Sequence, residues 1–481
     1  MIRKLPIAPL SYIRYADAYT MQNEPISSVD LIRRAALAIA AKLMESVAAT
    51  SPLYFFCGKG NNGADGLYSA LLLSPFYPVR IFVEAQPEKA SEEYLYFLNL
   101  LQSNNITIEF YSDFLSLDYI DPKVCFVDAL LGTGLKGLPR EPFASLIHFM
   151  NNLPNKIYSI DIASGLNPDC YSPDTLAVEA HKTYSFQFPK MAFMWPEYEQ
   201  FVGDFEILDI GLHPDILNPI DVSSYLIDAV NPIPLHKFDH KGKRGKTLLI
   251  AGSDLLPGAA LLSIGGALRS GVGYVEAIVP QSIKNAALQS YPSVILRSMH
   301  KLDDERYDSV MCGPGLGTDF EAKSRLLLAL NMKSKCLILD ADALNLIHAD
   351  PGLMHLLPAN TVITPHIGEF DRLTHKHENH SARLETLKNF AIQHKIFVLL
   401  KGAHSCLACP DGNLFFNNSG NAGLARAGSG DVLSGLMAGL CAGDLAFQDA
   451  IIQAVFMHGR MAENALKYIS MQEMNASDLI R

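Results

Sequence analysis

The chain has 481 residues, 49% of them hydrophobic, and a formal net charge of −11. This length predicts two domains with sizeable cores, and the negative charge argues against nucleic acids and anionic membranes as partners. The eight cysteines follow no disulfide spacing, residues 1–10 lack the apolar core of a signal peptide, and no apolar run reaches about 18 residues. We therefore expect a cytoplasmic protein that does not enter a membrane.

Strands and helices alternate through the first half of the chain, which predicts a parallel α/β sheet. The expected strands are 53–57, 79–84, 106–111, 123–128 and 156–161, and the expected helices are 67–73 and 91–103. Ligand sites in such sheets lie at the carboxyl ends of the strands. Cys57, Asp128 and Asp161 stand at such ends.

A glycine-rich segment, Gly58-Lys-Gly-Asn-Asn-Gly-Ala-Asp-Gly66, follows the first of these strands and precedes a helix. Its backbone amides can cradle a phosphate, and its glycines let a ligand come close to the backbone. The spacing is neither the dinucleotide-binding fingerprint nor a Walker motif. An ordinary turn between a strand and a helix is the alternative interpretation.

Two carboxylates follow at later strand ends. Asp128 precedes a second glycine loop that contains Gly132 and Gly134, and Asp161 stands three residues before Ser164. A set of oxygen donors from Asn, Asp and Ser, without Cys or His, suits a hard cation. Alternatively, each aspartate only caps the loop that follows its strand.

These segments resemble the NAD(P)HX epimerase domain, also called the YjeF N-terminal domain, over about residues 10–215. The family's substrate is a nicotinamide coenzyme hydrated at C6 of its reduced ring. The resemblance implies a Rossmann-like three-layer fold, K⁺ bound by Asn62, Asp128 and Ser164, and a catalytic Asp161 that exchanges a proton during inversion at C6. The implied substrate contacts are Asn61, Asn62, Gly63, Ala64, Asp65, Gly132, Thr133, Gly134, Leu135, Lys136, Gly137, Leu138 and Asp161.

Two residues depart from the usual pattern of that family. Ala64 stands where the family usually has glycine, and Ala163 stands where it usually has proline. Ala64 would crowd a phosphate cradle if its φ angle had to be positive. Ala163 should cost only loop rigidity. Neither change removes a side chain that the resemblance assigns to the substrate or to K⁺.

The second half of the chain repeats the alternation of strands and helices. Residues 211–238 contain four prolines and little periodicity, so we place a domain boundary near residue 225 and predict domains at 1–225 and 226–481. The expected strands of the second domain are 246–251, 275–279, 309–312, 336–339, 361–364 and 397–400.

Gly428-Ser-Gly-Asp431 is the most informative motif of this half, because an apolar helical run follows it directly. A helix that begins at such glycines presents free backbone amides and the positive end of its dipole, which suits a phosphate. An aspartate at this place can accept a proton from a hydroxyl held beside the phosphate. The alternative is a tight turn whose aspartate caps the helix.

This motif and five others resemble the ribokinase-like superfamily and, more narrowly, its ADP/ATP-dependent NAD(P)HX dehydratases. The others are Ile250-Ala-Gly-Ser253, Cys312-Gly-Pro-Gly-Leu-Gly317, Leu339-Asp-Ala-Asp-Ala-Leu-Asn345, Thr364-Pro-His-Ile-Gly-Glu-Phe370 and Lys401-Gly-Ala-His404. They stand in family-like order across about residues 236–445.

The resemblance also assigns residues to the two ligands of the second domain. The implied nucleotide contacts are Lys401, Gly402, Ala403, His404, Ser405 and Gly430, and the implied contacts to the hydrated coenzyme are Ala259, Gly317, His366 and Asp431. Asp431 would be the catalytic base, and Asp340 and Asp342 would lie near Mg²⁺ and phosphate. Arg426 would contact phosphate or point to solvent, and His366 has the alternative of a capped loop position.

We therefore expect an α/β protein with a Rossmann-like first domain and a ribokinase-like second domain. The expected function is coenzyme repair: the first domain epimerises R- and S-NAD(P)HX, and the second dehydrates S-NAD(P)HX to NAD(P)H at the expense of ADP or ATP. The expected ligands are NADHX or NADPHX, an adenine nucleotide, K⁺ and Mg²⁺, in a homo-oligomer. The alternative is a small-molecule kinase of the thiamine-precursor type, fused to a first domain that only binds.

Overall fold

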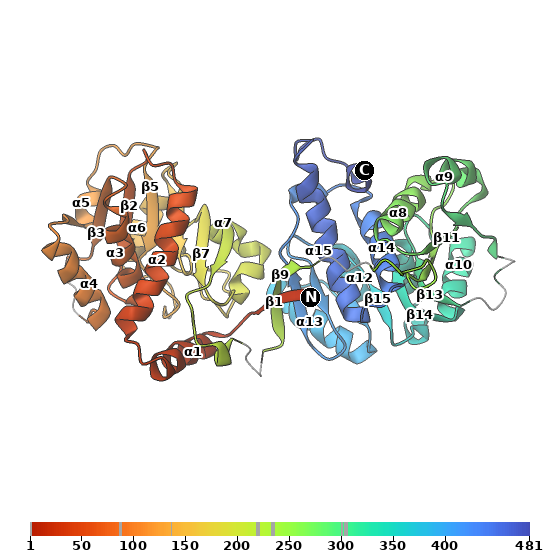
Figure 1. The fold of residues 1–481 in the computed structure, drawn as a ribbon, viewed down its shortest axis with the longest axis horizontal. Helices are drawn as coiled ribbons and strands as arrows, with labels where there is room; N and C mark the ends of the chain where they lie inside the picture. The colour runs from red at the N-terminus through yellow and green to blue at the C-terminus, as the bar shows by residue number, and fades with distance from the viewer. Residues whose placement is uncertain are drawn as a thin grey trace. The chain divides into compact units, whose positions relative to one another are not determined.

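The computed structural model describes residues 2–85, 89–135, 137–217, 222–231, 236–299, 302 and 306–481. The chain forms two compact units: residues 6–222 make up the first, and residues 223–481 together with residues 1–5 make up the second. Figure 1 shows a layer of strands with helices packed against it in each unit. The prediction of an α/β fold is confirmed for both.

The first unit is built on a seven-stranded sheet with the order β4-β3-β2-β5-β6-β7-β8, in which every pairing is parallel. The strands are β2 (Leu53–Cys57), β3 (Val79–Val83), β4 (Ile108–Phe110), β5 (Cys125–Ala129), β6 (Ile157–Ile160), β7 (Lys182–Phe186) and β8 (Asp204–Leu208). The order reverses between β2 and β5, and such a switch point opens a crevice at the carboxyl ends of its two strands.

Seven α-helices accompany this sheet. They are α1 (Leu10–Asn23), α2 (Ser28–Ser46), α3 (Asn61–Leu73), α4 (Glu92–Ser103), α5 (Tyr111–Leu115), α6 (Phe143–Asn151) and α7 (Glu199–Val202), within the described residues. A capping box between Ser27 and Asp30 begins α2, whose apolar face packs with α3 against the sheet.

Helix α3 begins six residues earlier than the sequence pattern predicts, at Asn61 instead of Leu67. The glycine-rich segment is therefore not a loop but mostly the first turns of the helix. A Cβ atom on Gly63 would lie 1.6 Å from the carbonyl oxygen of Gly58, so only glycine lets the helix start this close to the end of β2. The low helical propensity of glycine hid this start.

The second unit contains an eleven-stranded sheet with the order β1-β9-β18-β17-β16-β15-β14-β13-β10-β11-β12. Its strands are β1 (Ile2–Pro6), β9 (Ser224–Val230), β10 (Lys246–Ile250), β11 (Tyr274–Ile278), β12 (Ile295–Leu296), β13 (Tyr307–Cys312), β14 (Ser334–Leu339), β15 (Thr361–Ile363), β16 (Phe397–Leu400), β17 (Cys406–Ala408) and β18 (Leu414–Asn417). Strands β16 to β18 pair antiparallel, and the strands from β12 to β16 in the order above pair in parallel.

The first strand of the chain belongs to this second sheet. Arg3 in β1 pairs with Asp228 in β9 at 3.1 Å, and the ammonium group of Lys4 lies 4.7 Å from the centre of the Tyr225 ring. The chain therefore starts in the second unit, passes through the whole first unit, and returns at β9. Neither β1 nor β9 shows a periodicity from which the sequence would predict it.

The helices of the second unit are α8 (Pro257–Arg269), α9 (Lys284–Ser290), α10 (Phe320–Asn331), α11 (Asp342–Ala349), α12 (Ile367–Leu373), α13 (His380–His394), α14 (Ser429–Cys441) and α15 (Phe447–Ala465), within the described residues. Helix α14 is buried along almost its entire length and packs closely against α8. Among the helices that the structure describes, none is long and apolar enough to cross a membrane.

Glycines set the close approach of α8 and α14. A Cβ atom on Gly435 would lie 1.9 Å from the carbonyl oxygen of Ser263, which is backbone that cannot rotate away. We expect Gly435→Ala to lower the free energy of unfolding by about 1–3 kcal/mol through overpacking. Thermal unfolding measures this loss. Gly258→Ala is the matched control, since a Cβ there meets nothing within 4 Å, and an unchanged melting temperature for Gly435→Ala would contradict the prediction.

Candidate functional site

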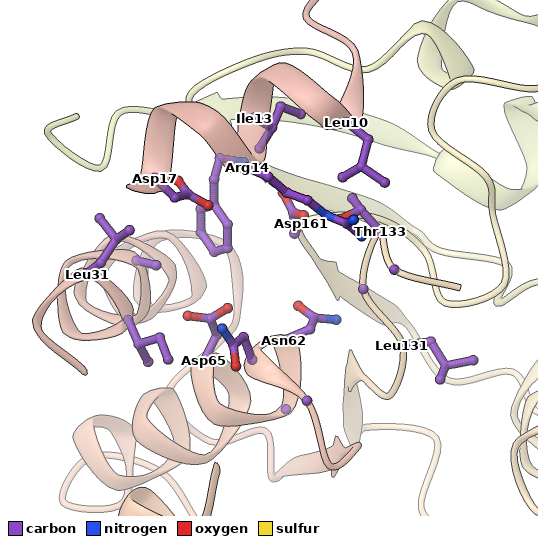
Figure 2. A pocket seen from close by; sticks show the side chains of 18 of the residues that line it. Leu10, Ile13, Arg14, Asp17, Leu31, Asn62, Asp65, Leu131, Thr133 and Asp161 are labelled. Atoms are coloured by element: carbon purple, nitrogen blue, oxygen red, sulfur yellow. The ribbon is translucent and has the colours of Figure 1, made fainter. Parts of the chain in front are cut away.

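A cavity of about 810 Å³ opens in the first unit at the switch point between β2 and β5. Helices α1 and α3 and the loops after β5 and β6 form its walls (Figure 2). Most of the substrate contacts expected from the sequence line it together: Asn61, Asn62, Gly63, Asp65, Gly132, Thr133, Gly134, Leu135 and Asp161.

Three expected contacts do not line this cavity, and a fourth falls outside the described residues. Ala64 is fully buried in the apolar core, and it is not among the residues with positive φ, so the helix accommodates alanine there without strain. Gly137 lies outside the cavity wall, and Leu138 is half exposed. Lys136 falls outside the described residues.

Asp161 lies directly after β6 in a strained backbone conformation, with φ at +66°. Its Oδ1 accepts hydrogen bonds from the ammonium group of Lys190 at 2.7 Å and from the backbone N–H of Phe186 at 3.2 Å. Lys190 is 1% exposed and also donates to the hydroxyl of Ser185. Strained residues of this kind are concentrated at functional sites, because the surrounding contacts must hold them in place.

Three further residues, which the sequence did not predict, belong to this environment: Lys190, Arg14 and Asp17. Arg14 and Asp17 lie on α1 and enter the cavity from the side of Asp161 (Figure 2). Burial and the neighbouring Asp161 raise the pKa of Asp17 to about 6, against the opposing effect of Lys190. No local sequence pattern marks these residues, because Lys190 is recognisable only once the fold buries it and so requires a charged partner.

The residues expected to bind K⁺ lie at the ends of β5 and β6 and at the start of α3. The hydroxyl of Ser164 donates to Oδ1 of the fully buried Asp128 at 2.5 Å and lies 3.1 Å from the carbonyl oxygen of Leu131. Both polar side-chain atoms of Asn62 are buried and have no hydrogen-bond partner among the described residues. Such an orphaned amide and a set of oxygen donors fit a hard monovalent cation.

In the second unit, the ends of β14 and β16 meet the start of α14. The fully buried Asp340 accepts hydrogen bonds from the ammonium group of Lys401 at 2.7 Å and from the hydroxyl of Ser434 at 2.5 Å. A Cβ atom on Gly430 would lie 3.5 Å from Nζ of Lys401, so the glycine turn runs past this ion pair. Ala341, which follows Asp340 in the chain, has φ at +49° and is a second strained position at a strand end.

Asp431 lies in the first turn of α14, but it is not the N-cap of that helix. The N-cap is Gly428 with φ at +90°, and no side chain caps the helix start. Burial and the neighbouring Asp340 raise the pKa of Asp431 to about 7, against the opposing effect of Lys401. Asp431 is therefore a partly buried carboxyl group that does not cap the helix.

The other expected contacts to the hydrated coenzyme lie on loops and at helix starts near this centre. The N–H of Gly317 donates to Asp342 at 2.8 Å, and Gly315 lies against Ala259 at the start of α8. His366 accepts a hydrogen bond from the N–H of Glu369 and so caps α12, while its side chain stays 54% exposed. His366 therefore takes the capped position, and its Nε2 lies 3.5 Å from Oε1 of Glu369.

The remaining expected contacts form a turn after β16. The backbone N–H of Lys401 donates to the carbonyl of Pro365, which joins this turn to His366. The hydroxyl of Ser405 bonds the backbone of Gly402, and the ring of His404 lies 3.3 Å from the carbonyl oxygen of Asn417. Arg426 donates to the carbonyl of Gln472, so its guanidinium has a structural partner.

Comparisons with known proteins identify both halves. Residues 28–192 match the family model described as YjeF-related protein N-terminus, and residues 247–481 match that described as NAD(P)H-hydrate dehydratase. The bifunctional NAD(P)H-hydrate repair enzyme Nnr of Moorella thermoacetica is 30% identical over 95% of this chain and 91% of its own length. The corresponding enzyme of Synechocystis is 34% identical over 88% of this chain and 82% of its own.

Among solved structures, the ADP/ATP-dependent NAD(P)H-hydrate dehydratase of Bacillus subtilis, co-crystallised with ATP and Mg²⁺, is similar to the second half. It is 30% identical, covers 51% of this chain and 90% of its own, and has a TM-score of 0.46. The two bifunctional relatives match most of the chain and so extend over both units. The chain belongs to the family of bifunctional NAD(P)H-hydrate repair enzymes.

Proposed function

We propose that the two units hold two separate catalytic centres for the repair of hydrated nicotinamide coenzymes. The first unit interconverts R- and S-NAD(P)HX, and the second dehydrates S-NAD(P)HX to NAD(P)H with ADP or ATP as phosphoryl donor. One observation supports this assignment above all. Each unit has a carboxylate beside glycine-rich turns and close to a lysine: Asp161 beside the buried Lys190, and Asp431 beside the half-buried Lys401.

In the first unit, the hydrated ring would enter the cavity between α1 and α3. Asp161 would exchange a proton with the C6 hydroxyl group, since its carboxylate is held at the cavity wall by Lys190 and Phe186. K⁺ bound by Asn62, Asp128 and Ser164 would supply positive charge for the phosphates of the coenzyme.

In the second unit, hydroxide is a poor leaving group, and transfer of a phosphoryl group to the C6 oxygen makes it a good one. Asp431 would accept the hydroxyl proton as the oxygen attacks phosphorus, and the amides of residues 428–430 would stabilise the charge on the transferring group. Elimination of phosphate then restores the diene of the nicotinamide ring. Mg²⁺ bound near Asp340 and Asp342 would neutralise phosphate charge, and Lys401 would contact the nucleotide.

Incubation with a mixture of NADHX epimers tests this proposal. With ADP, the absorbance of reduced nicotinamide should return for both epimers, and without a nucleotide it should not return. Accumulation of a phosphorylated small molecule without recovery of NADH would favour the kinase alternative. We expect ADP to be the better donor, and a cytoplasmic location and a homo-oligomer stay predictions.

The cation is testable separately. Replacing K⁺ by Li⁺ should lower the rate of inversion, and Asp128→Ala should remove the difference between the two salts, because Asp128 is the charged member of the donor set. Ser159→Ala is the matched control, since Ser159 also donates to Asp128 at 2.8 Å but is not an expected ligand. Equal rates of the wild-type protein in both salts would contradict a functional K⁺ site.

A further inference from the structure

One carboxyl oxygen in the first-unit cavity has no hydrogen-bond partner among the described residues. Asp65 lies on α3, is 8% exposed and lines the cavity, and its Oδ1 has no hydrogen-bond partner among the described residues. In Figure 2 it points from α3 into the open space, while Asp17 and Asp161 enter that space from the other side. A buried polar atom without a partner is costly and indicates a group that a ligand will satisfy.

We propose that Asp65 is the general acid of epimerisation and works from the wall opposite the base, Asp161. This inference rests on the epimerase activity proposed for the first unit and assigns the second proton transfer of that reaction. The resemblance to the epimerase family implied only that Asp65 contacts the substrate. The geometry adds that the two carboxyl groups face the cavity from two sides, so that one can serve the C6 hydroxyl and the other the adjacent N1.

The reaction between these two groups is balanced without any co-reactant. Asp161 removes the proton of the C6 hydroxyl, and the electron pair of that O–H bond forms the carbonyl double bond. The C6–N1 bond breaks, and its electron pair takes the proton of Asp65 at N1. Rotation about C5–C6 turns the other face of the aldehyde towards N1. Reclosure then returns one proton to Asp65 and the other to the oxygen.

The two carboxyl groups have different surroundings. Burial raises the pKa of Asp65 well above its usual value, and Asp161 and Asp17 raise it further. Asp161 instead accepts a hydrogen bond from an ammonium group. The charged or titratable groups that face Asp65 across the cavity are Arg14 and Asp17 on α1, Lys59 before α3, and Asp161 with its partner Lys190.

Asp65→Asn is the principal test, because asparagine has the shape of a protonated aspartate but cannot transfer a proton. We expect the rate of R-to-S inversion to fall by on the order of 10²–10⁴-fold with little change in KM. In wild-type protein the rate should also fall at high pH as Asp65 loses its proton, and this fall should be absent in Asp65→Asn. Asp174→Asn, an exposed aspartate outside the cavity wall, is the control.

Chemical rescue separates an acid from a residue that only supports the fold. In Asp65→Ala, added formic acid should occupy the vacated space and restore part of the inversion rate, and acetamide should not. Thermal unfolding of each variant establishes that it is folded. An Asp65→Asn rate within a few-fold of wild type, or a slow folded variant with neither formate rescue nor a changed pH profile, would overturn the assignment. If wild-type protein itself does not invert the epimers, the proposed epimerase function fails instead.

Discussion

Asp431→Asn should lower nucleotide-dependent dehydration by on the order of 10²–10⁴-fold while the two hydrate epimers continue to interconvert. The variant keeps the shape of the side chain and removes only its ability to accept a proton. Because Gly428 is the N-cap of α14, the helix start does not depend on this carboxylate. Nucleotide affinity, dehydration and inversion should be measured on the same preparation.

A matched control separates the loss of a catalytic base from the loss of a negative charge in the first turn of a helix. Asp449 lies in the first turn of α15, at the same position relative to the helix start as Asp431 in α14, and it is exposed. Asp449→Asn should leave dehydration unchanged. Dehydration by Asp431→Asn within a few-fold of wild type would show that Asp431 is not the base and would move the search to Asp340, Asp342 or His366.

The same residue predicts a pH dependence. Burial raises the pKa of Asp431 to about 7, so a substantial part of the free enzyme holds a protonated Asp431 near neutral pH. A base acts only in its deprotonated form, and the pH profile of kcat/KM reports the free enzyme. The kcat/KM for dehydration should therefore rise with pH up to about 7 and level off above it.

Asp161→Asn should abolish inversion of the epimers and leave the protein folded. Asparagine tolerates a positive φ as well as aspartate does, so the backbone at +66° can be kept, and its side-chain oxygen can still accept a hydrogen bond from Lys190. What the variant loses is the proton acceptor, which is worth on the order of 10²–10⁴ in rate. Separation of the epimers over time by chromatography measures it.

Two further results show whether Asp161→Asn affects only the inversion of the epimers. Dehydration of purified S epimer with ADP should proceed as in wild type, because the second unit carries that activity under our proposal. Wild-type inversion by a folded Asp161→Asn protein would rule out Asp161 as the base. Ser185→Ala tests the support of Lys190 separately from the base, since the Ser185 hydroxyl accepts a hydrogen bond from Lys190 at 2.5 Å but has no expected contact with the substrate.

The sequence predicted the strands of both sheets better than the side chains that complete the sites. Buried strands such as β2 and β16 are short apolar runs between glycine or polar residues, so local pattern is enough to find them. Lys190 lies 29 residues from Asp161, and Asp17 lies on a helix without a glycine motif, so only the tertiary fold brings them to the cavity. The predicted start of α3 was wrong because the glycines of its first turns have poor helical propensity. Tertiary contacts override that propensity in the folded protein.

The N-terminal strand has a consequence for how this protein can be made and divided. Strand β1 is synthesised first, but its neighbour β9 follows only after the whole first unit, so the edge of the second sheet is completed by a contact of long sequence separation. A cut near residue 225 would carry β1 away on the wrong fragment and divide β9 itself, which exposes an unpaired strand to aggregation. A fragment of residues 6–222 would avoid both problems, and a matching second fragment would also need β1 to form its complete sheet.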